Sequence, residues 1–161
     1  MAVWQFDLEL MPSSVAIDPS RYVEAANTDG GLETKDWWVQ NQPSYGLVEA
    51  ISNHFALIDS WSKDIVRFGS EDAVLIELFT ENGLVVGVAA RIDLRHLTPP
   101  PLIALLKLSS YLRCKFFVME TQAIVEPIMA ELVPQIEKSR AAKFCRDPEA
   151  YLAEVIRDQM S

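Results

Sequence analysis

The stretch DIVRFGSEDAVLIELFTENGLVVGVAARIDL, residues 64–94, decides the fold. It contains three apolar runs of strand length, at residues 64–68, 73–79 and 84–94. A turn-forming GSED segment separates the first two runs, and Asn82-Gly83 separates the last two, where Asn-Gly between apolar runs is the strongest short hairpin signal. The stretch therefore predicts an antiparallel meander of three strands.

Elements on both sides of the meander extend this pattern. Strict alternation predicts a half-buried strand over residues 3–10, and a short apolar run predicts another over residues 114–119. Spacing and capping signals predict helices beginning at Pro19, at Ser44, at Leu102, at Pro127 with a break near Pro134, and at Pro148. Because helices and strands do not alternate one for one, we predict one α+β domain over residues 1–161, with a mainly antiparallel sheet of about five strands.

Length and composition set the class of protein. The chain has 161 residues, of which half are apolar and 23% are charged, a mixture suited to a packed core. The first twenty residues carry acids instead of an early basic segment, and the longest apolar runs are far shorter than a membrane span needs. The two cysteines, Cys114 and Cys145, match no metal or redox spacing. We therefore expect a cytoplasmic protein with no membrane partner, no metal and no disulfide.

The charge is concentrated in the N-terminal half. The formal net charge is −9, and residues 1–90 hold 14 acidic and 4 basic side chains. A negative field disfavours nucleic acid, since affinity there comes largely from Lys and Arg on phosphates. A basic protein is therefore the expected kind of partner, unless the charge only keeps the chain soluble.

The sequence contains no recognisable catalytic motif. It has neither a GxxxxGK[ST] loop nor a GxGxxG turn, and its histidines, His54 and His96, stand in no nucleophile or metal context. We therefore predict no catalytic residue and no cofactor, and favour a protein that is not an enzyme.

One polar cluster follows the last strand of the meander. At strand period Arg91, Asp93 and Arg95 share a face with the small residues Gly87 and Ala89. A ligand could approach the small residues closely while the two guanidinium groups hold an anion. The alternative is an ion network at the rim of the sheet.

A second candidate surface combines aromatic and acidic side chains. It comprises Trp37, Trp38, Trp61, Glu71 and Asp72, all in the acidic half of the chain. Such a surface suits recognition of a basic protein. The alternative is that the aromatic rings lie in the core, although an extended segment would leave one of Trp37 and Trp38 partly exposed.

The order of these segments also resembles known proteins. The segments are WQF at 4–6, Trp61, FGSED at 68–72, ARIDLR at 90–95 and the stretch 139–148. Together they resemble small uncharacterised bacterial cytosolic α+β families, some of which are similar to immunity proteins of bacterial toxin systems. The resemblance implies a protein that binds another protein.

The leading prediction is therefore a protein-binding module, in the form of an immunity-type inhibitor of a basic partner. One alternative is a small-molecule or anion site, enzymatic or not, near Arg91, Asp93 and Arg95. Another is a structural homodimer.

Overall fold

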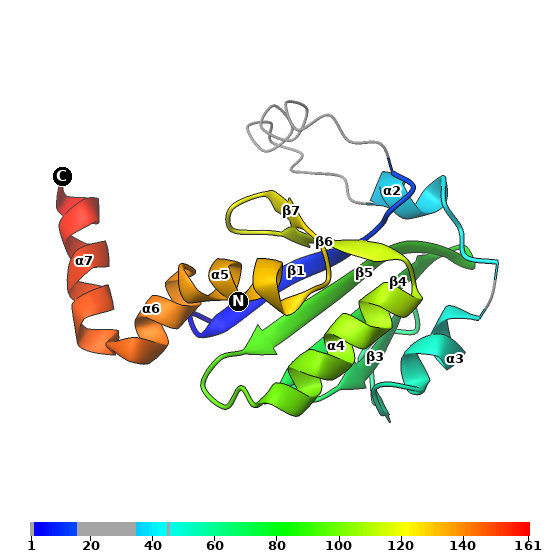
Figure 1. The fold of residues 1–161 in the computed structure, drawn as a ribbon, viewed down its shortest axis with the longest axis horizontal. Coiled ribbons are helices and arrows are strands. Elements are labelled where there is room, and N and C mark those ends of the chain that lie inside the picture. The colour runs from blue at the N-terminus through cyan, green and yellow to red at the C-terminus, as the bar shows by residue number, and fades with distance from the viewer. Residues whose placement is uncertain (1, 16–34, 45) are drawn as a thin grey trace.

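The computed structural model describes residues 2–15, 35–44 and 46–161. It confirms the predicted α+β class, with seven antiparallel strands in the order β2-β3-β4-β5-β1-β6-β7 (Figure 1). The strands are β1 (Gln5–Pro12), β2 (Leu57–Ile58), β3 (Ile65–Gly69), β4 (Val74–Glu81), β5 (Leu84–Asp93), β6 (Cys114–Val118) and β7 (Ala123–Val125). The two strands beyond the expected five, β2 and β7, have only two and three residues, too few to show a period in the sequence.

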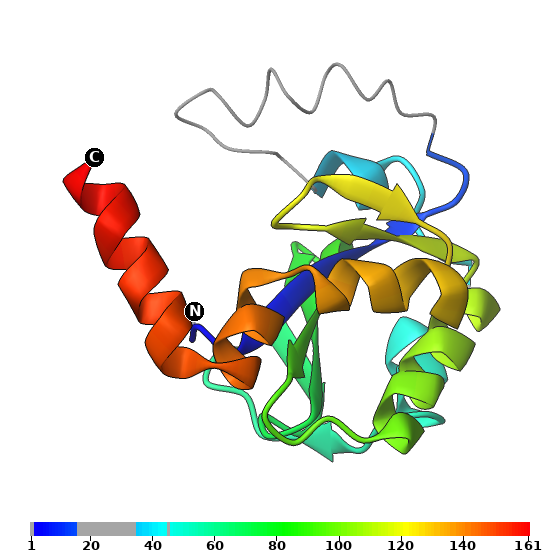
Figure 2. The same ribbon diagram turned by 60° about the vertical axis from the view of Figure 1, so that its left-hand side comes forward.

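The helices are mostly gathered on one face of the sheet. They are α2 (Lys35–Val39), α3 (Leu47–Ser52), α4 (Pro99–Tyr111), α5 (Met129–Glu137), α6 (Arg140–Arg146) and α7 (Pro148–Met160). Figures 1 and 2 show α4 and α5 on the same side of the sheet, with α7 projecting away from it. Within the described residues, no helix combines the length and the apolar character needed to cross a membrane.

Alternation along β1 separates the two faces of the sheet. Phe6, Leu8 and Leu10 are almost fully buried and belong to the core beneath the helices. Their neighbours in the chain point to the opposite face. Because β1 lies between β5 and β6 in the middle of the sheet, both of its faces influence the whole domain.

The predicted hairpin is present at the tip of β4 and β5. Asn82 and Gly83 have φ values of 52° and 78°, the left-handed pair required by a type I′ turn. The register shifts between Phe79, which pairs with Gly87, and Thr80, which pairs with Val85, so β5 carries one extra residue at this point.

Helix α2 overturns one expectation. Trp37 and Trp38 are both buried, because they lie in a short helix and not in an extended segment. Trp37 packs edge-on against Phe117 of β6, with ring centroids 5.4 Å apart. The indole Nε1 of Trp38 donates a hydrogen bond to the carbonyl of Leu10, 3.0 Å away. These two rings therefore belong to the core.

Several helix boundaries also differ from expectation. Helix α3 begins after Gly46 rather than at Ser44, and α4 begins three residues early, at Pro99, because prolines fit the first turn of a helix. The break expected near Pro134 falls after Glu137, where Ser139 caps α6 through Ala142 N at 3.1 Å. The helix predicted from Pro19 lies outside the described residues.

Helix α7 begins as predicted but has no core to join. Asp147 caps it by accepting a hydrogen bond from Ala150 N at 3.0 Å. None of its residues is buried, and Leu152 and Ile156 are 50% and 57% exposed. Of the apolar face expected for this helix, Tyr151 packs edge-on against Phe144 of α6, whereas Leu152 and Ile156 are left exposed.

The β3–β4 turn gives a test of the fold. Gly69 has a φ of +89°, and a Cβ there would lie 2.1 Å from the carbonyl oxygen of Val74. We expect Gly69→Ala to destabilise the protein by about 3 kcal/mol, because strain adds to a backbone clash. Gly83→Ala has a positive φ but open space around it, so its cost should be about 1 kcal/mol. If urea unfolding shows the same loss of stability for both variants, the backbone clash at Gly69 is not the cause.

Candidate functional site

The sheet face opposite α4 carries a band of charged side chains. Cross-strand pairing places Arg67 of β3 beside Glu77 of β4, and Glu77 beside Ala89 of β5. The same row continues from Ala89 to Glu9 of β1 and then to Phe117 of β6. Two carboxylates therefore flank one small side chain on the surface of the sheet.

The small side chain leaves a hollow, which we call the sheet-face hollow. It has a volume of about 230 Å³ and is lined chiefly by Asp7, Glu9, Glu77, Phe79, Ala89 and Arg91. Strands lie about 4.8 Å apart, so the backbones of Glu9 and Glu77 stand roughly 10 Å from each other across Ala89. That width accommodates one inserted side chain between the two carboxylates.

Glu9 is the unusual group of the hollow. Burial, and second the nearby charge of Asp7, raise the pKa of Glu9 to about 7. Its cross-strand neighbours are Ala89 and the buried ring of Phe117, neither of which can donate a hydrogen bond from its side chain. No described residue gives the Glu9 carboxylate a hydrogen bond or an ion pair.

The neighbouring acids, in contrast, have guanidinium partners. Asp7 Oδ1 accepts a hydrogen bond from Arg91 Nε at 3.1 Å, although Asp7 Oδ2 is buried with no partner among the described residues. Arg67 pairs with Glu71 through Nη2, and its Nε lies 3.6 Å from Glu77 Oε2. The hollow is thus a network of paired charges around one unpaired carboxylate.

The structure places the predicted anion cluster at the end of β5. Arg91 shares its face with Gly87 and lines the hollow, as strand period requires, but its guanidinium is already joined to Asp7. A Cβ added at Gly87 would meet only the Phe79 ring, at an ordinary distance of 3.5 Å. The geometry at Arg91 and Gly87 therefore gives no evidence of an anion site.

Asp93 and Arg95 form a pair of their own. The Asp93 carboxylate is buried and accepts hydrogen bonds from Arg95 Nη2 at 2.6 Å and from the Arg95 backbone N at 2.9 Å. The side-chain bond is the main reason why the pKa of Asp93 is lowered. The Arg95 guanidinium also lies 4.1 Å from the centre of the Trp4 ring, a cation–π contact. Arg95 therefore fixes the chain where β5 ends.

The aromatic and acidic candidates are divided among three places. Trp37 and Trp38 lie in the core, whereas Trp61 is 79% exposed in the connection before β3. Glu71 and Asp72 follow the other end of β3, about 16 Å away for five strand residues. The Arg67 guanidinium holds the pKa of Glu71 below its usual range. Of these candidates, Trp61, Glu71 and Asp72 are exposed, and Glu71 is paired with Arg67.

Sequence reasoning missed Asp7, Glu9 and Glu77. The alternation of β1 assigned Asp7 and Glu9 to the polar face, which the structure confirms. What the sequence lacked was the register of β1 against β5, which brings Glu9 to Ala89 and Asp7 to Arg91. The only indication in the sequence was that Asp7 and Glu9 lie on the polar face of one strand, so their side chains contact those of the neighbouring strand. The sequence did not identify that strand.

Other chemical groups of the described chain offer no competing centre. The described residues contain no group of three His, Cys, Asp or Glu side chains placed to hold a metal ion. Burial raises the pKa of the Cys114 thiol to about 12, which makes it a poor nucleophile. Cys145 is also a free thiol.

Comparison with known proteins gives no relative. No protein-family model matches the chain, no curated protein matches it, and no solved structure matches it.

Glu9 makes the stability of the fold depend on pH. Its carboxyl group has a pKa near 4.5 in the unfolded chain and about 7 in the folded protein. The contribution of Glu9 to the free energy of unfolding is therefore fully present below pH 4.5. That contribution is lost as the pH rises through 7. Glu9→Gln removes the charge, so the variant should be more stable than the wild type by about 3 kcal/mol at pH 8 and of nearly equal stability at pH 4.5.

Urea unfolding at the two pH values measures this effect. Glu81→Gln, at the exposed end of β4, serves as the matched control and should not reproduce it. The account of Glu9 is wrong if its variant shows the same stability difference at both pH values.

Proposed function

We propose that this chain is a protein-binding module that recognises a basic partner through the sheet-face hollow. A lysine or arginine side chain of the partner enters between Glu9 and Glu77. The observation that carries the proposal is the Glu9 carboxylate, half-buried in an open hollow with no cationic partner among the described residues.

The energetics favour a cation at this place. Burial raises the free energy of a charged carboxylate that has no partner, and the pKa of Glu9 is raised for this reason. Two opposite charges about 4 Å apart attract each other by roughly 4 kcal/mol at the effective dielectric constant of a protein surface, before desolvation is subtracted. An entering ammonium or guanidinium group would thus restore the charged form of Glu9.

The surroundings favour a protein over a small cation. The hollow, at about 230 Å³, suits a single side chain, and the described residues hold no metal-binding group. The acidic N-terminal half supplies a field that would steer a basic surface toward the sheet. Trp61 is exposed beside β3 and offers the kind of aromatic anchor that is enriched at interfaces.

The finer proposal is an immunity-type inhibitor acting in the cytoplasm. Such a protein would cover a basic surface of its target, and the acidic hollow suits that task. The anion-binding alternative at Arg91 and Arg95 gains no support. Arg95 holds the Asp93 carboxylate through both Nε and Nη2. Arg91 shares the hollow with three carboxylates, which repel an anion. The homodimer alternative stays a prediction.

Charge reversal in the hollow tests the proposal. Immobilised wild-type chain should retain proteins of high isoelectric point from a native lysate at low salt and release them at high salt. Glu9→Lys should abolish this retention, since the new ammonium group occupies the place of the partner's cation. Glu81→Lys makes the same charge change at the exposed end of β4 and should keep most of the binding.

Two results would count against this function. One is that the wild-type chain retains no basic protein at low salt. The other is that Glu9→Lys and Glu81→Lys lose binding equally. Retention would then depend on the net charge of the chain and not on the hollow. Light scattering of the wild-type chain alone shows whether it is a dimer before any partner is added.

A further inference from the structure

A second cavity lies where β6 ends and β1 continues with β5 alone beside it. Strand β6 stops at Val118, and Met119 N makes one more hydrogen bond, to the carbonyl of Asp7 at 3.2 Å. Beyond that point α6 and the start of α7 stand beside β1. The cavity between them has a volume of about 450 Å³, and we call it the α6–β1 cavity.

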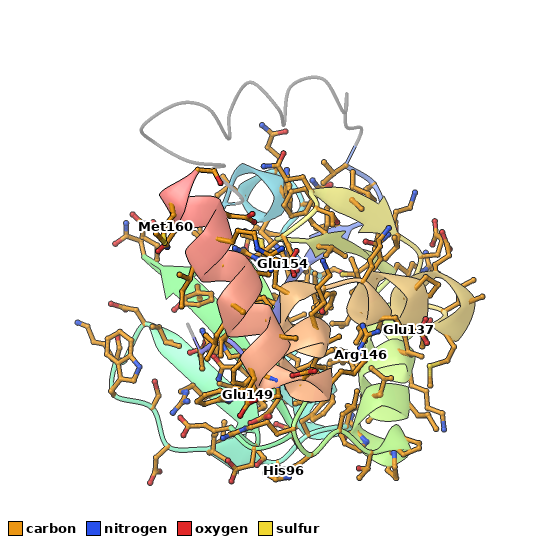
Figure 3. All side chains as sticks on the ribbon, turned by 90° about the vertical axis from the view of Figure 1, so that its left-hand side faces the viewer. His96, Glu137, Arg146, Glu149, Glu154 and Met160 are labelled. Carbon is orange, nitrogen blue, oxygen red and sulfur yellow. The ribbon has the colours of Figure 1, made fainter. Side chains whose placement is uncertain are left out.

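Side chains of both kinds line this cavity. The polar ones are Gln5, Asp7, Glu120, Arg140 and Tyr151. Val3 and Met119 contribute apolar surface beside them. Figure 3 views this end of the molecule, with α7 in front and Arg146 marking the end of α6. A cavity of this size is within the range of small-molecule sites.

The carboxylate oxygens of the cavity are either engaged or closed to solvent. Both carboxylate oxygens of Glu120 accept from the backbone N of Arg140, at 3.1 and 3.2 Å, and Glu120 Oε1 also lies 3.3 Å from Arg140 Nε. Asp7 Oδ1 holds Arg91, and Asp7 Oδ2 is sealed from solvent. Neither acid therefore has an open oxygen that lacks a cation beside it.

The donors, by contrast, are available. The terminal nitrogens of Arg140, whose side chain is 71% exposed, have no acceptor among the described residues. The same holds for the hydroxyl of Tyr151, whose ring is fixed edge-on against Phe144. Gln5 Oε1 accepts from Ala2 N at 3.0 Å, which leaves the amide NH2 of Gln5 without an acceptor in the described structure. The cavity thus offers three unused donors to a ligand.

We propose that the α6–β1 cavity binds a small monocarboxylic acid with an apolar body. The carboxylate would take both terminal nitrogens of Arg140 in the fork geometry that guanidinium groups favour, with further bonds from Tyr151 and Gln5. The apolar body would lie along Val3 and Met119. A dianionic phosphate fits less well, because the lining holds two carboxylates and one guanidinium.

This proposal does not depend on the function assigned to the sheet-face hollow. Asp7 and Met119 line both sites, but the two sites call for ligands of opposite charge, and Arg140 lines the α6–β1 cavity alone.

The test is an amide NMR titration of the full chain at constant ionic strength. Benzoate and hexanoate are the probes, with hexylammonium and inorganic phosphate as comparisons. We expect saturable shifts from the two carboxylates at Gln5, Met119 and Tyr151. Arg140→Gln should weaken binding at least tenfold, because a bond between two charged groups is lost. Tyr151→Phe should weaken it about threefold.

Two further variants keep the test decisive. Arg157→Gln removes a guanidinium from α7 outside the cavity lining and should bind as the wild type does. Gln5→Glu replaces a donor with a repelling carboxylate and should weaken binding tenfold even if Arg140→Gln does not fold. The proposal is overturned if neither carboxylate saturates, if phosphate or hexylammonium binds more tightly, or if folded Arg140 and Gln5 variants bind normally.

Discussion

The register between β1 and β5 is the constraint on which the rest of the domain depends. Leu8 pairs with Ala90 and Glu9 pairs with Ala89, so the apolar side chains of β1 face the helices and its acids face away. Side chains alternate along a strand, and a slip of one residue would move Asp7 and Glu9 into the core. The cost of burying those charges keeps β1 in a single register, and that register creates the charged face.

The same register explains why two acids on one strand behave differently. Asp7 meets Arg91 across β5 and is held by a guanidinium. Glu9 meets the small side chain of Ala89 on one side and the buried ring of Phe117 on the other. Trp37 packs edge-on against the Phe117 ring. Two acids only two residues apart on the strand thus differ, because Asp7 has a cationic partner, whereas Glu9 has none among the described residues and its pKa is raised to about 7.

Local signals in the sequence predicted much of the fold. The meander follows from its apolar runs and from Asn82-Gly83, whose left-handed conformation few residue pairs adopt readily. Asp147 and Pro148 predicted the start of α7 because capping depends only on neighbouring residues. The placement of Trp37 and Trp38 could not be predicted, since a helix of five residues leaves no readable period.

The candidate site shows the same division between local and distant information. Alternation predicted which face of β5 carries Arg91, and the structure agrees. It did not predict that β1 would lie beside β5, because strands separated by some eighty residues are paired by the global packing of the sheet. The α6–β1 cavity has the same origin, since it exists only because β6 ends before β1 does.

The most direct test of this account is the titration of the Glu9 side chain itself. Carbon-13 NMR of the side-chain carboxyl carbons, with Glu9 assigned by comparison with Glu9→Gln, gives its pKa in the folded protein. The structure predicts a midpoint of about 7. A midpoint near the ordinary value of about 4.5 would show that Glu9 is solvated or paired, and it would contradict both the hollow and the function proposed for it.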